Sequence, residues 1–239
     1  MSNDVKVSDE IALLLEELGI RHAFGVIGAG NVHLFESITR YGYTEIICVH
    51  HEQTATMAMQ TYYRSSGRLC AALLTTGGGV ANGVTGVVSA WADSIPGLVI
   101  AGNEHSKHTS NENPLRMWGV QGYDSVAMME KVTKYSVRVT DPCQALFELE
   151  KASKISLESR SGPVWVEIPM DIQSSKLPVG NLKRYRSRTN VSFEPTPSEI
   201  SSVVKALKKA ERPLLWLGHG IRLSGAVSQL QVLLDQLDV

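Results

Sequence analysis

The sequence lacks a charge imbalance and a long hydrophobic run. Its 23 Lys and Arg residues nearly balance 24 Asp and Glu residues, giving a formal net charge of -1. That balance offers no electrostatic basis for binding nucleic acid or an acidic membrane surface. No apolar stretch reaches the length of a membrane-spanning helix, and the polar, acidic start MSNDVKVSDE is unlike a signal peptide. We therefore expect a cytoplasmic protein with no nucleic-acid and no membrane partner.

Cysteine is also scarce. Cys48, Cys70 and Cys143 are odd in number and widely spaced, which excludes a disulfide framework or a cysteine-based zinc site. Each lies among apolar residues, so the pattern predicts buried thiols in a reducing compartment.

The common phosphate-binding fingerprints are missing as well. Two glycine clusters, Gly28-Ala29-Gly30 and Gly77-Gly78-Gly79, do not fit the dinucleotide motif, and no glycine-rich loop ends in Lys-Ser or Lys-Thr. A free-standing nucleotide-binding domain is thus a poor interpretation. Taken singly, each cluster is typical of a tight turn or of a close approach between helix and strand.

What the sequence does contain is a regular alternation of helices and apolar strands. A first helix is predicted to begin with Ser8 as its N-cap and to end at Gly19. Strands are expected at residues 22–26, 44–49, 69–74, 96–101 and 164–168, with helices at 32–39, 52–63 and 80–92. This alternation predicts an α/β fold, a doubly wound and mainly parallel sheet with helices on both faces.

The chain is expected to contain one complete domain and part of another. Residues 1–178 form the first domain, and the aperiodic, polar residues 179–196 form a linker. Residues 197–239 then predict a helix, a strand at 213–217 and a helix, the start of a second α/β domain. One such element has too little apolar surface to form a domain by itself.

The glycine clusters and His51-Glu52-Gln53 all follow predicted strands, where open α/β sheets bind ligands. A glutamate at the start of a helix could simply be favoured by the helix dipole. Here, however, it begins an ordered series of motifs. They are His51-Glu52-Gln53, Tyr62 to Gly67, Thr75-Thr76-Gly77-x-Gly79-x-x-Asn82, Asp93-Ser94-x-Pro96, Gln121-x-x-Asp124, and Gly162-Pro163-Val164 to Asp171.

This series resembles the N-terminal, pyrimidine-binding domain of thiamine-diphosphate-dependent enzymes of the acetolactate-synthase type. The resemblance implies that Glu52 is catalytic, because a glutamate at this position hydrogen-bonds a pyrimidine nitrogen of the cofactor and activates it. It further implies two sets of binding residues. Cofactor-binding residues would be Gly28, Thr75, Thr76, Gly77 and Asn82, and substrate-facing residues would be Ala29, Gly30, His51, Val120 and Gln121.

The resemblance also implies a partner. Related enzymes bind the diphosphate through Mg²⁺ with a Gly-Asp-Gly motif followed by Asn in a separate domain, and this sequence contains no Gly-Asp-Gly. We therefore expect no metal ligands here, a shared thiamine diphosphate, and Mg²⁺ on a partner chain that carries this motif. The expected assembly is a homo- or hetero-oligomer acting on a 2-oxo acid, and a natural split subunit is favoured over a truncation.

An alternative stays open. Ile27, Gln60 and Thr61 depart from the residues usual in the family, and a non-catalytic interaction subunit derived from such an enzyme could carry these changes. Retention of Glu52 argues against that alternative.

Overall fold

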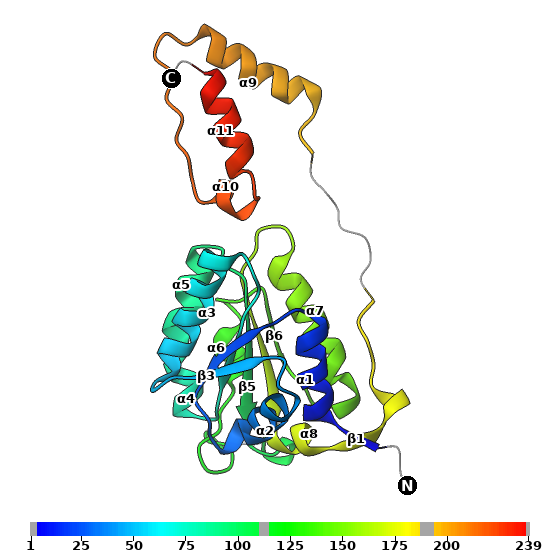
Figure 1. Cartoon of the computed structure of the whole chain (residues 1–239). Helices are drawn as coiled ribbons and strands as arrows, with labels where there is room; N and C mark the ends of the chain where they lie inside the picture. The colour runs from blue at the N-terminus through cyan, green and yellow to red at the C-terminus, as the bar shows by residue number, and fades with distance from the viewer. Residues whose placement is uncertain (1–3, 110–114, 187–193, 238–239) are drawn as a thin grey trace. The chain divides into compact units, whose positions relative to one another are not determined.

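The computed structural model describes residues 4–109, 115–186 and 194–237. The chain divides into two compact units, Met1–Ser187 and Arg188–Val239, which we call unit 1 and unit 2 and describe separately (Figure 1). The division falls inside the segment 179–196.

Unit 1 is built on a six-stranded sheet with the order β3-β2-β4-β5-β7-β6. Every neighbouring pair in it is parallel. The strands are β2 (His22–Gly25), β3 (Glu45–Cys48), β4 (Ala71–Leu74), β5 (Gly97–Asn103), β6 (Tyr135–Arg138) and β7 (Pro163–Pro169). A separate antiparallel pair joins β1 (Asp4–Lys6) to β8 (Lys176–Pro178). The mainly parallel α/β fold predicted from the sequence is confirmed.

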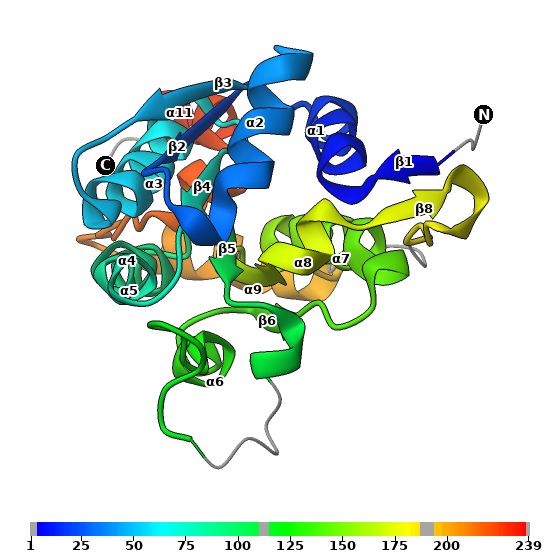
Figure 2. The ribbon, with the colours of Figure 1, turned by 90° about the horizontal axis from the view of Figure 1, so that it is seen from below.

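Helices cover both faces of this sheet (Figure 2). One face packs against α1 (Val7–Glu17), α2 (Val32–Tyr41), α7 (Ala145–Leu157) and α8 (Met170–Ser174). The other packs against α3 (Glu52–Ser66), α4 (Gly78–Asn82), α5 (Val84–Ala92) and α6 (Ser125–Met129). Strand residues alternate between the two cores: Leu73 and Ile100 belong to the first, Leu74 and Val99 to the second. Burial on both faces explains why these strands are apolar throughout rather than alternating with polar residues.

The strand order creates a switch point at the carboxyl ends of β2 and β4. From β2 the chain moves outward to β3, then returns to place β4 on the opposite side of β2. Connections on either side of such a point diverge, so a crevice opens there. The turn after β2 and the turn after β4 both contain residues predicted to bind ligand.

Two helix predictions for unit 1 need correction. Ser8 is not an N-cap but lies inside α1, where its buried hydroxyl is 2.8 Å from Ser37 Oγ of α2. The helix expected at residues 80–92 is split into α4 and α5 at Gly83. A side chain at Gly83 would press on Leu74 and Thr56, so this close approach to the sheet and α3 needs a glycine.

The burial predicted for the cysteines is correct only for Cys70, whose burial raises its pKa to about 12. Cys143 is half-buried and Cys48 is exposed. Cys48 is exposed because β3 is an edge strand of the sheet, which leaves residues 45–48 less covered than the buried strand predicted there.

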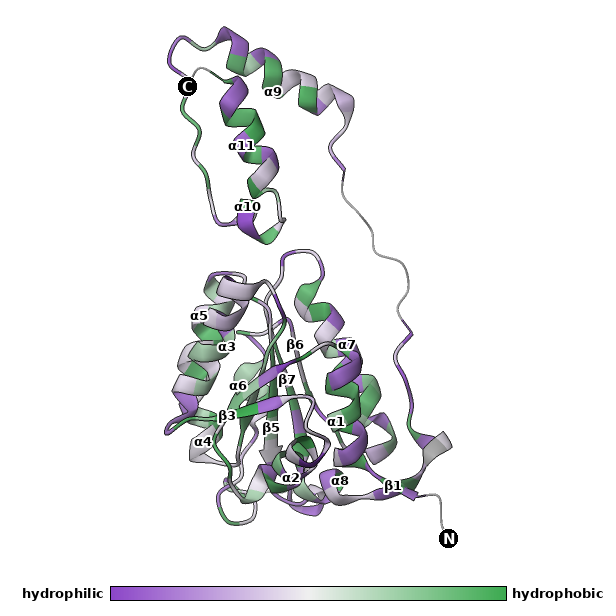
Figure 3. Ribbon diagram, viewed as in Figure 1, coloured by the Kyte–Doolittle hydropathy of each residue, from purple (hydrophilic) through white to green (hydrophobic). Residues whose placement is uncertain are grey.

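Unit 2 contains α9 (Pro197–Lys209), α10 (Gly220–Leu223) and α11 (Val227–Gln236). Apolar and polar residues alternate around α9 and α11 (Figure 3). The strand predicted at residues 213–217 is wrong, since no strand is formed there. None of the helices in the described parts of the chain is both long and apolar enough to cross a membrane.

Candidate functional site

Glu52 opens α3 directly after the turn that follows β3. His51 caps the helix, with its Nδ1 accepting a hydrogen bond from the Gln53 amide at 3.2 Å. The Glu52 side chain therefore lies in the first helical turn, where the helix dipole favours a carboxylate. It is only 8% exposed. A carboxylate removed from water in this way needs polar partners.

The partner comes from α4. Asn82 Nδ2 donates a hydrogen bond to Glu52 Oε2 at 3.0 Å. Within the described residues, Oε1 receives no hydrogen bond, and it faces Gly79, where a Cβ atom would lie only 2.8 Å away. The carboxylate is thus fixed through one oxygen and closely approached by backbone at the other. It could share a proton with a ring nitrogen that reaches Oε1.

The turn after β2 packs against the turn after β4. A Cβ atom on Gly28 would overlap Thr75 Oγ1, and one on Gly30 would overlap Thr76 Oγ1. The Gly30 amide donates to Thr75 Oγ1 at 3.3 Å. Close contact, rather than an unusual backbone conformation, therefore accounts for both glycines. Thr75 also joins this turn to the Glu52 side, because its Cγ2 would meet a Cβ on Gly79 at 2.7 Å.

A third segment reaches the site from the loop after β5. Gln121 Nε2 donates to the Thr76 carbonyl at 3.3 Å, and the Gln121 amide donates to Glu104 Oε1 at the same distance. Gly77 has a positive φ of 71°, and a Cβ there would lie 2.6 Å from the Gln121 carbonyl. Val120, next to Gln121, is 84% exposed. The loop is thereby held against the turn after β4 and presents an apolar side chain at its rim.

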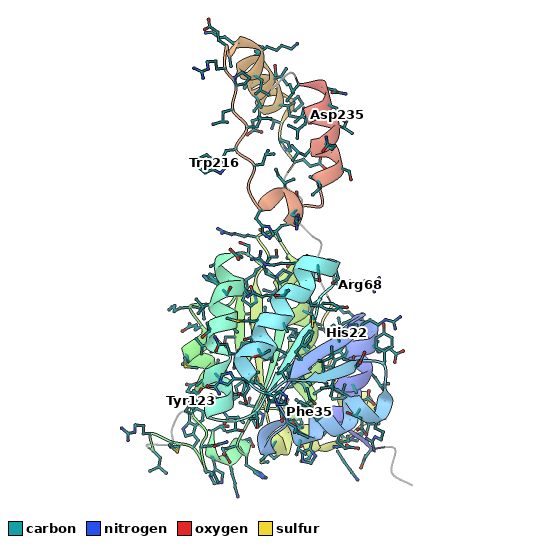
Figure 4. All side chains as sticks on the ribbon, turned by 60° about the vertical axis from the view of Figure 1, so that its left-hand side comes forward. His22, Phe35, Arg68, Tyr123, Trp216 and Asp235 are labelled. Carbon is teal, nitrogen blue, oxygen red and sulfur yellow. The ribbon has the colours of Figure 1, made fainter. Side chains whose placement is uncertain are left out.

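The end of this loop is tied to the sheet. Asn103, the buried last residue of β5, donates through Nδ2 to the Tyr123 carbonyl at 3.1 Å. Tyr123, labelled in Figure 4, has a buried hydroxyl without a hydrogen-bond partner among the described residues. Burial, and secondarily the charge of Glu167, raises the pKa of Tyr123 to about 12. Its hydroxyl therefore stays protonated at neutral pH.

The structure thus joins most of the predicted site residues through direct contacts. Glu52 and Asn82 form one part, and Gly28, Gly30, Thr75, Thr76, Gly77 and Gln121 form the other. Two predicted substrate residues, Ala29 and His51, are exposed and are not joined to either part by these contacts. His51 instead directs its Nδ1 to the amide of Gln53 in its own helix. The binding roles of all these residues stay predictions.

The sequence analysis missed two residues that help to shape the site, Glu104 and Asn31. Glu104 anchors Gln121, and its place at the carboxyl end of β5 could have identified it. Asn31 closes the turn after β2: its Oδ1 accepts from the Gly28 amide at 2.8 Å, and its Nδ2 donates to the Val26 carbonyl at 3.1 Å. No motif in the sequence marks Asn31. Across the described residues, no three His, Cys, Asp or Glu side chains gather as a metal site would require.

Comparisons with known proteins identify the family. The family described as thiamine pyrophosphate enzyme, N-terminal TPP binding domain, matches residues 5–134. The acetolactate synthase large subunit of Buchnera aphidicola subsp. Acyrthosiphon pisum is 30% identical over 233 residues, covering 94% of this chain and 39% of that protein. The acetolactate synthase large subunit of Lactococcus lactis is 26% identical over 230 residues, covering 94% and 38%.

A mitochondrial relative extends the range of organisms. The acetolactate synthase of Schizosaccharomyces pombe is 28% identical over 211 residues, covering 84% of this chain and 31% of that protein. The chain thus spans less than half the length of these curated relatives. The family match alone extends over more than half of this chain. The chain therefore belongs to the thiamine pyrophosphate enzyme family, and residues 5–134 correspond to its N-terminal TPP-binding domain.

Proposed function

We propose that this chain is the pyrimidine-binding part of a thiamine-diphosphate-dependent enzyme of the acetolactate-synthase type, a 2-oxo acid decarboxylase and carboligase. The observation that carries the proposal is the Glu52 carboxylate, buried at the start of α3 and held through Oε2 by Asn82. The names of the relatives support the reaction class.

The residues fit the pyrimidine end of the cofactor. Oε1 of Glu52 accepts no hydrogen bond from the described residues, and glycine at position 79 keeps the space beside it free of a side chain. When bound, thiamine diphosphate supplies the electron sink for the bond changes at the 2-oxo acid. With the cofactor bound, Glu52 would share a proton with a pyrimidine nitrogen, and the hydrogen bond from Asn82 would keep the carboxylate from rotating away.

The remaining site residues divide into two groups in this proposal. Gly28 and Thr75 to Gly77, with Asn82, line the cofactor ring. Ala29, Gly30, His51, Val120 and Gln121 face the 2-oxo acid. Exposed apolar Val120 excludes water from that side once the site is covered.

A partner chain supplies the diphosphate and Mg²⁺ site, with its Gly-Asp-Gly and downstream Asn. Supporting this part is the outer face of α3 and α5, where Met57, Val88 and Trp91 are exposed beside the ion pair of Arg64 and Asp93. Exposed Met, Val and Trp with a charged pair at the margin are typical of a protein–protein interface. Helix α3, which carries part of this face, begins at Glu52. The assembly acts in the cytoplasm.

The test begins with a mild affinity purification of the chain from its native cells, followed by mass spectrometry. A stoichiometric partner containing Gly-Asp-Gly and a later Asn is expected. The purified complex is then assayed with pyruvate, thiamine diphosphate and Mg²⁺. Glu52→Gln should lower turnover by about 10²-fold or more, the range for loss of a proton-transferring group.

Glu45→Gln is the matched control, because Glu45 lies on the edge strand β3 with a 72% exposed side chain. Its turnover should equal that of the unmodified complex. If Glu52→Gln also leaves turnover unchanged, the chain is a non-catalytic interaction subunit. One observation favours that alternative: Gln60, a departure from the family, is buried and engaged with Ser89 rather than directed to the site.

A further inference from the structure

Gln173 is a fully buried polar side chain outside the predicted site. It lies on α8, the short helix that follows β7. Its Nε2 donates two hydrogen bonds of 2.7 Å, one to the Ile168 carbonyl at the end of β7 and one to the Gly30 carbonyl. Gly30 belongs to the turn after β2, 143 residues earlier in the chain.

The orientation of this amide is fixed by its surroundings. The side chain meets two carbonyl oxygens, which only accept hydrogen bonds, so the NH₂ group must face them. Its own Oε1 is buried and has no hydrogen-bond partner among the described residues. An unpaired buried acceptor destabilises a fold. A Met of similar size would remove the unpaired oxygen, but it would also remove both hydrogen bonds, so the Gln serves to hold these two carbonyls.

The carbonyl group that Gln173 holds is closely packed. A Cβ atom on Gly102, in β5, would overlap the Gly30 carbonyl, so this oxygen is pressed against strand backbone. On its other side, Gly30 has no room for a Cβ atom beside Thr76, and its amide donates to Thr75 Oγ1. Gly30 is therefore held on both sides: the turn after β4 binds its amide, in the Ala29–Gly30 peptide, and α8 binds its carbonyl, in the Gly30–Asn31 peptide.

Ala29, next to Gly30 in this turn, is exposed. Asn31 already bonds Gly28 within the turn, but these bonds are local and would move with it. Gln173 differs because it connects the turn to the end of β7, a central strand. Gln173 thereby sets the position of the turn relative to the sheet. The same sheet carries β4, and Thr75 in the turn after β4 lies beside Gly79, which faces Glu52.

We infer that Gln173 is a positioning residue, which acts through the Gly30 carbonyl to hold the turn Gly28–Asn31 where Ala29 and Gly30 orient the 2-oxo acid. This inference rests on the proposed function for its substrate. Whether Gln173 holds the turn can be measured without any activity. The position of the turn and the effect on catalysis are therefore tested by separate measurements.

The first measurement is hydrogen exchange on the purified complex, comparing the unmodified chain with Gln173→Met. We expect exchange in residues 26–34 to quicken by roughly threefold to tenfold, as for the net loss of one hydrogen bond. Exchange in α7 should be unchanged. Ser153→Ala, which removes another buried polar group without a partner in the described residues, is the control and should leave residues 26–34 unaltered.

The second measurement is steady-state kinetics with pyruvate. Gln173→Met should lower kcat or raise the KM for pyruvate, each by about threefold to tenfold. The affinity for thiamine diphosphate should fall by less than this, because the lost hydrogen bond is to Gly30 and not to Gly28. Gln173→Asn retains the amide on a shorter stem, so it should recover part of the loss. A merely structural role predicts instead that cofactor affinity and kcat fall together and that Asn does not rescue.

Several results would overturn the inference. They are unchanged exchange in residues 26–34, equal acceleration in α7, or altered exchange with unaltered kinetics. If the unmodified complex has no activity on 2-oxo acids, the proposed function fails. The exchange data then decide alone whether Gln173 holds the turn.

Discussion

Unit 1 and unit 2 have similar local sequence patterns but very different interiors. In unit 1, two apolar cores enclose the sheet, and Trp165 and Leu73 are completely buried. In the described part of unit 2, no residue is buried; Trp216 is 92% exposed and Leu214 85%. Trp216 projects away from the ribbon in Figure 4. The same residue types thus contribute to stability only where other elements cover them.

The difference shows which elements need long-range partners. Helix α9 forms because its ends are locally satisfied: Thr196 and Glu199 make a capping box, and Pro197 occupies the first turn. A strand instead requires hydrogen bonds from a neighbouring strand. Residues 213–217 have none in the described part of unit 2, although they are apolar, like the buried strands.

The largest expected effect contrasts two leucines. Leu73→Ala removes a completely buried side chain of β4 and should lower the free energy of unfolding of unit 1 by about 2–5 kcal/mol. Leu214→Ala removes an exposed side chain and should change it by less than about 0.5 kcal/mol. Urea unfolding followed by far-UV circular dichroism measures both. A comparable loss for Leu214→Ala would show that unit 2 is covered in solution.

A second contrast uses two glycines. Gly102→Ala places a methyl group against the Gly30 carbonyl, and the backbone must move, at a cost of about 1–3 kcal/mol. Gly218→Ala has nothing within 4 Å of the added Cβ atom and should stay within about 0.5 kcal/mol. The same urea titration decides. If Gly102→Ala and the unmodified chain had equal urea midpoints, the turn after β2 would be able to move aside at little cost in free energy.

Sequence reasoning predicted five of the six strands of the main sheet, all except β6, because their signal is local and repeated. Apolar runs such as residues 71–74 bounded by glycine-rich turns fix both the type and the order of the elements. The prediction for Ser8 was wrong because a contact with a residue far away in the sequence determines its structure. Ser8 has the chemistry of an N-cap, but the packing of α1 on α2 places it inside the helix, beside Ser37.

For the site, the ordered motifs located Glu52 and its surroundings, but not the residues that hold them. Gln173 lies 143 residues from the carbonyl it bonds, and Glu104 lies 17 residues from Gln121. Neither separation follows a helical or strand period, so no pattern along the chain connects the pairs. Only the strand order, with β5 next to β7, brings α8 and the turn after β2 together.

A smaller effect concerns the cap of α9. Thr196→Ala removes the acceptor of the Glu199 amide and should weaken the first turn by about 1 kcal/mol. Because unit 2 has no buried core in its described part, the loss should stay local: faster hydrogen exchange at residues 198–200 without a shift in the unfolding of unit 1. Ser202→Ala, which removes a hydroxyl bonded within the same helix, should change neither. A shift in the unfolding of unit 1 would mean that the two units are energetically coupled.

The last effect is spectroscopic. Of the four tryptophans, Trp216 is the most exposed and Trp165 is completely buried. Trp216→Phe should remove most of the iodide-quenchable fluorescence, whereas Trp165→Phe should remove emission that iodide does not reach. Trp91, on the outer face of α3 and α5, is partly exposed and supplies the remaining quenching. Covering of that face by the proposed partner should shield Trp91 without altering Trp216, unless the partner also completes unit 2. Measuring Trp216→Phe before and after addition of the partner separates these surfaces, since the signal left in that variant reports on Trp91 with no contribution from unit 2.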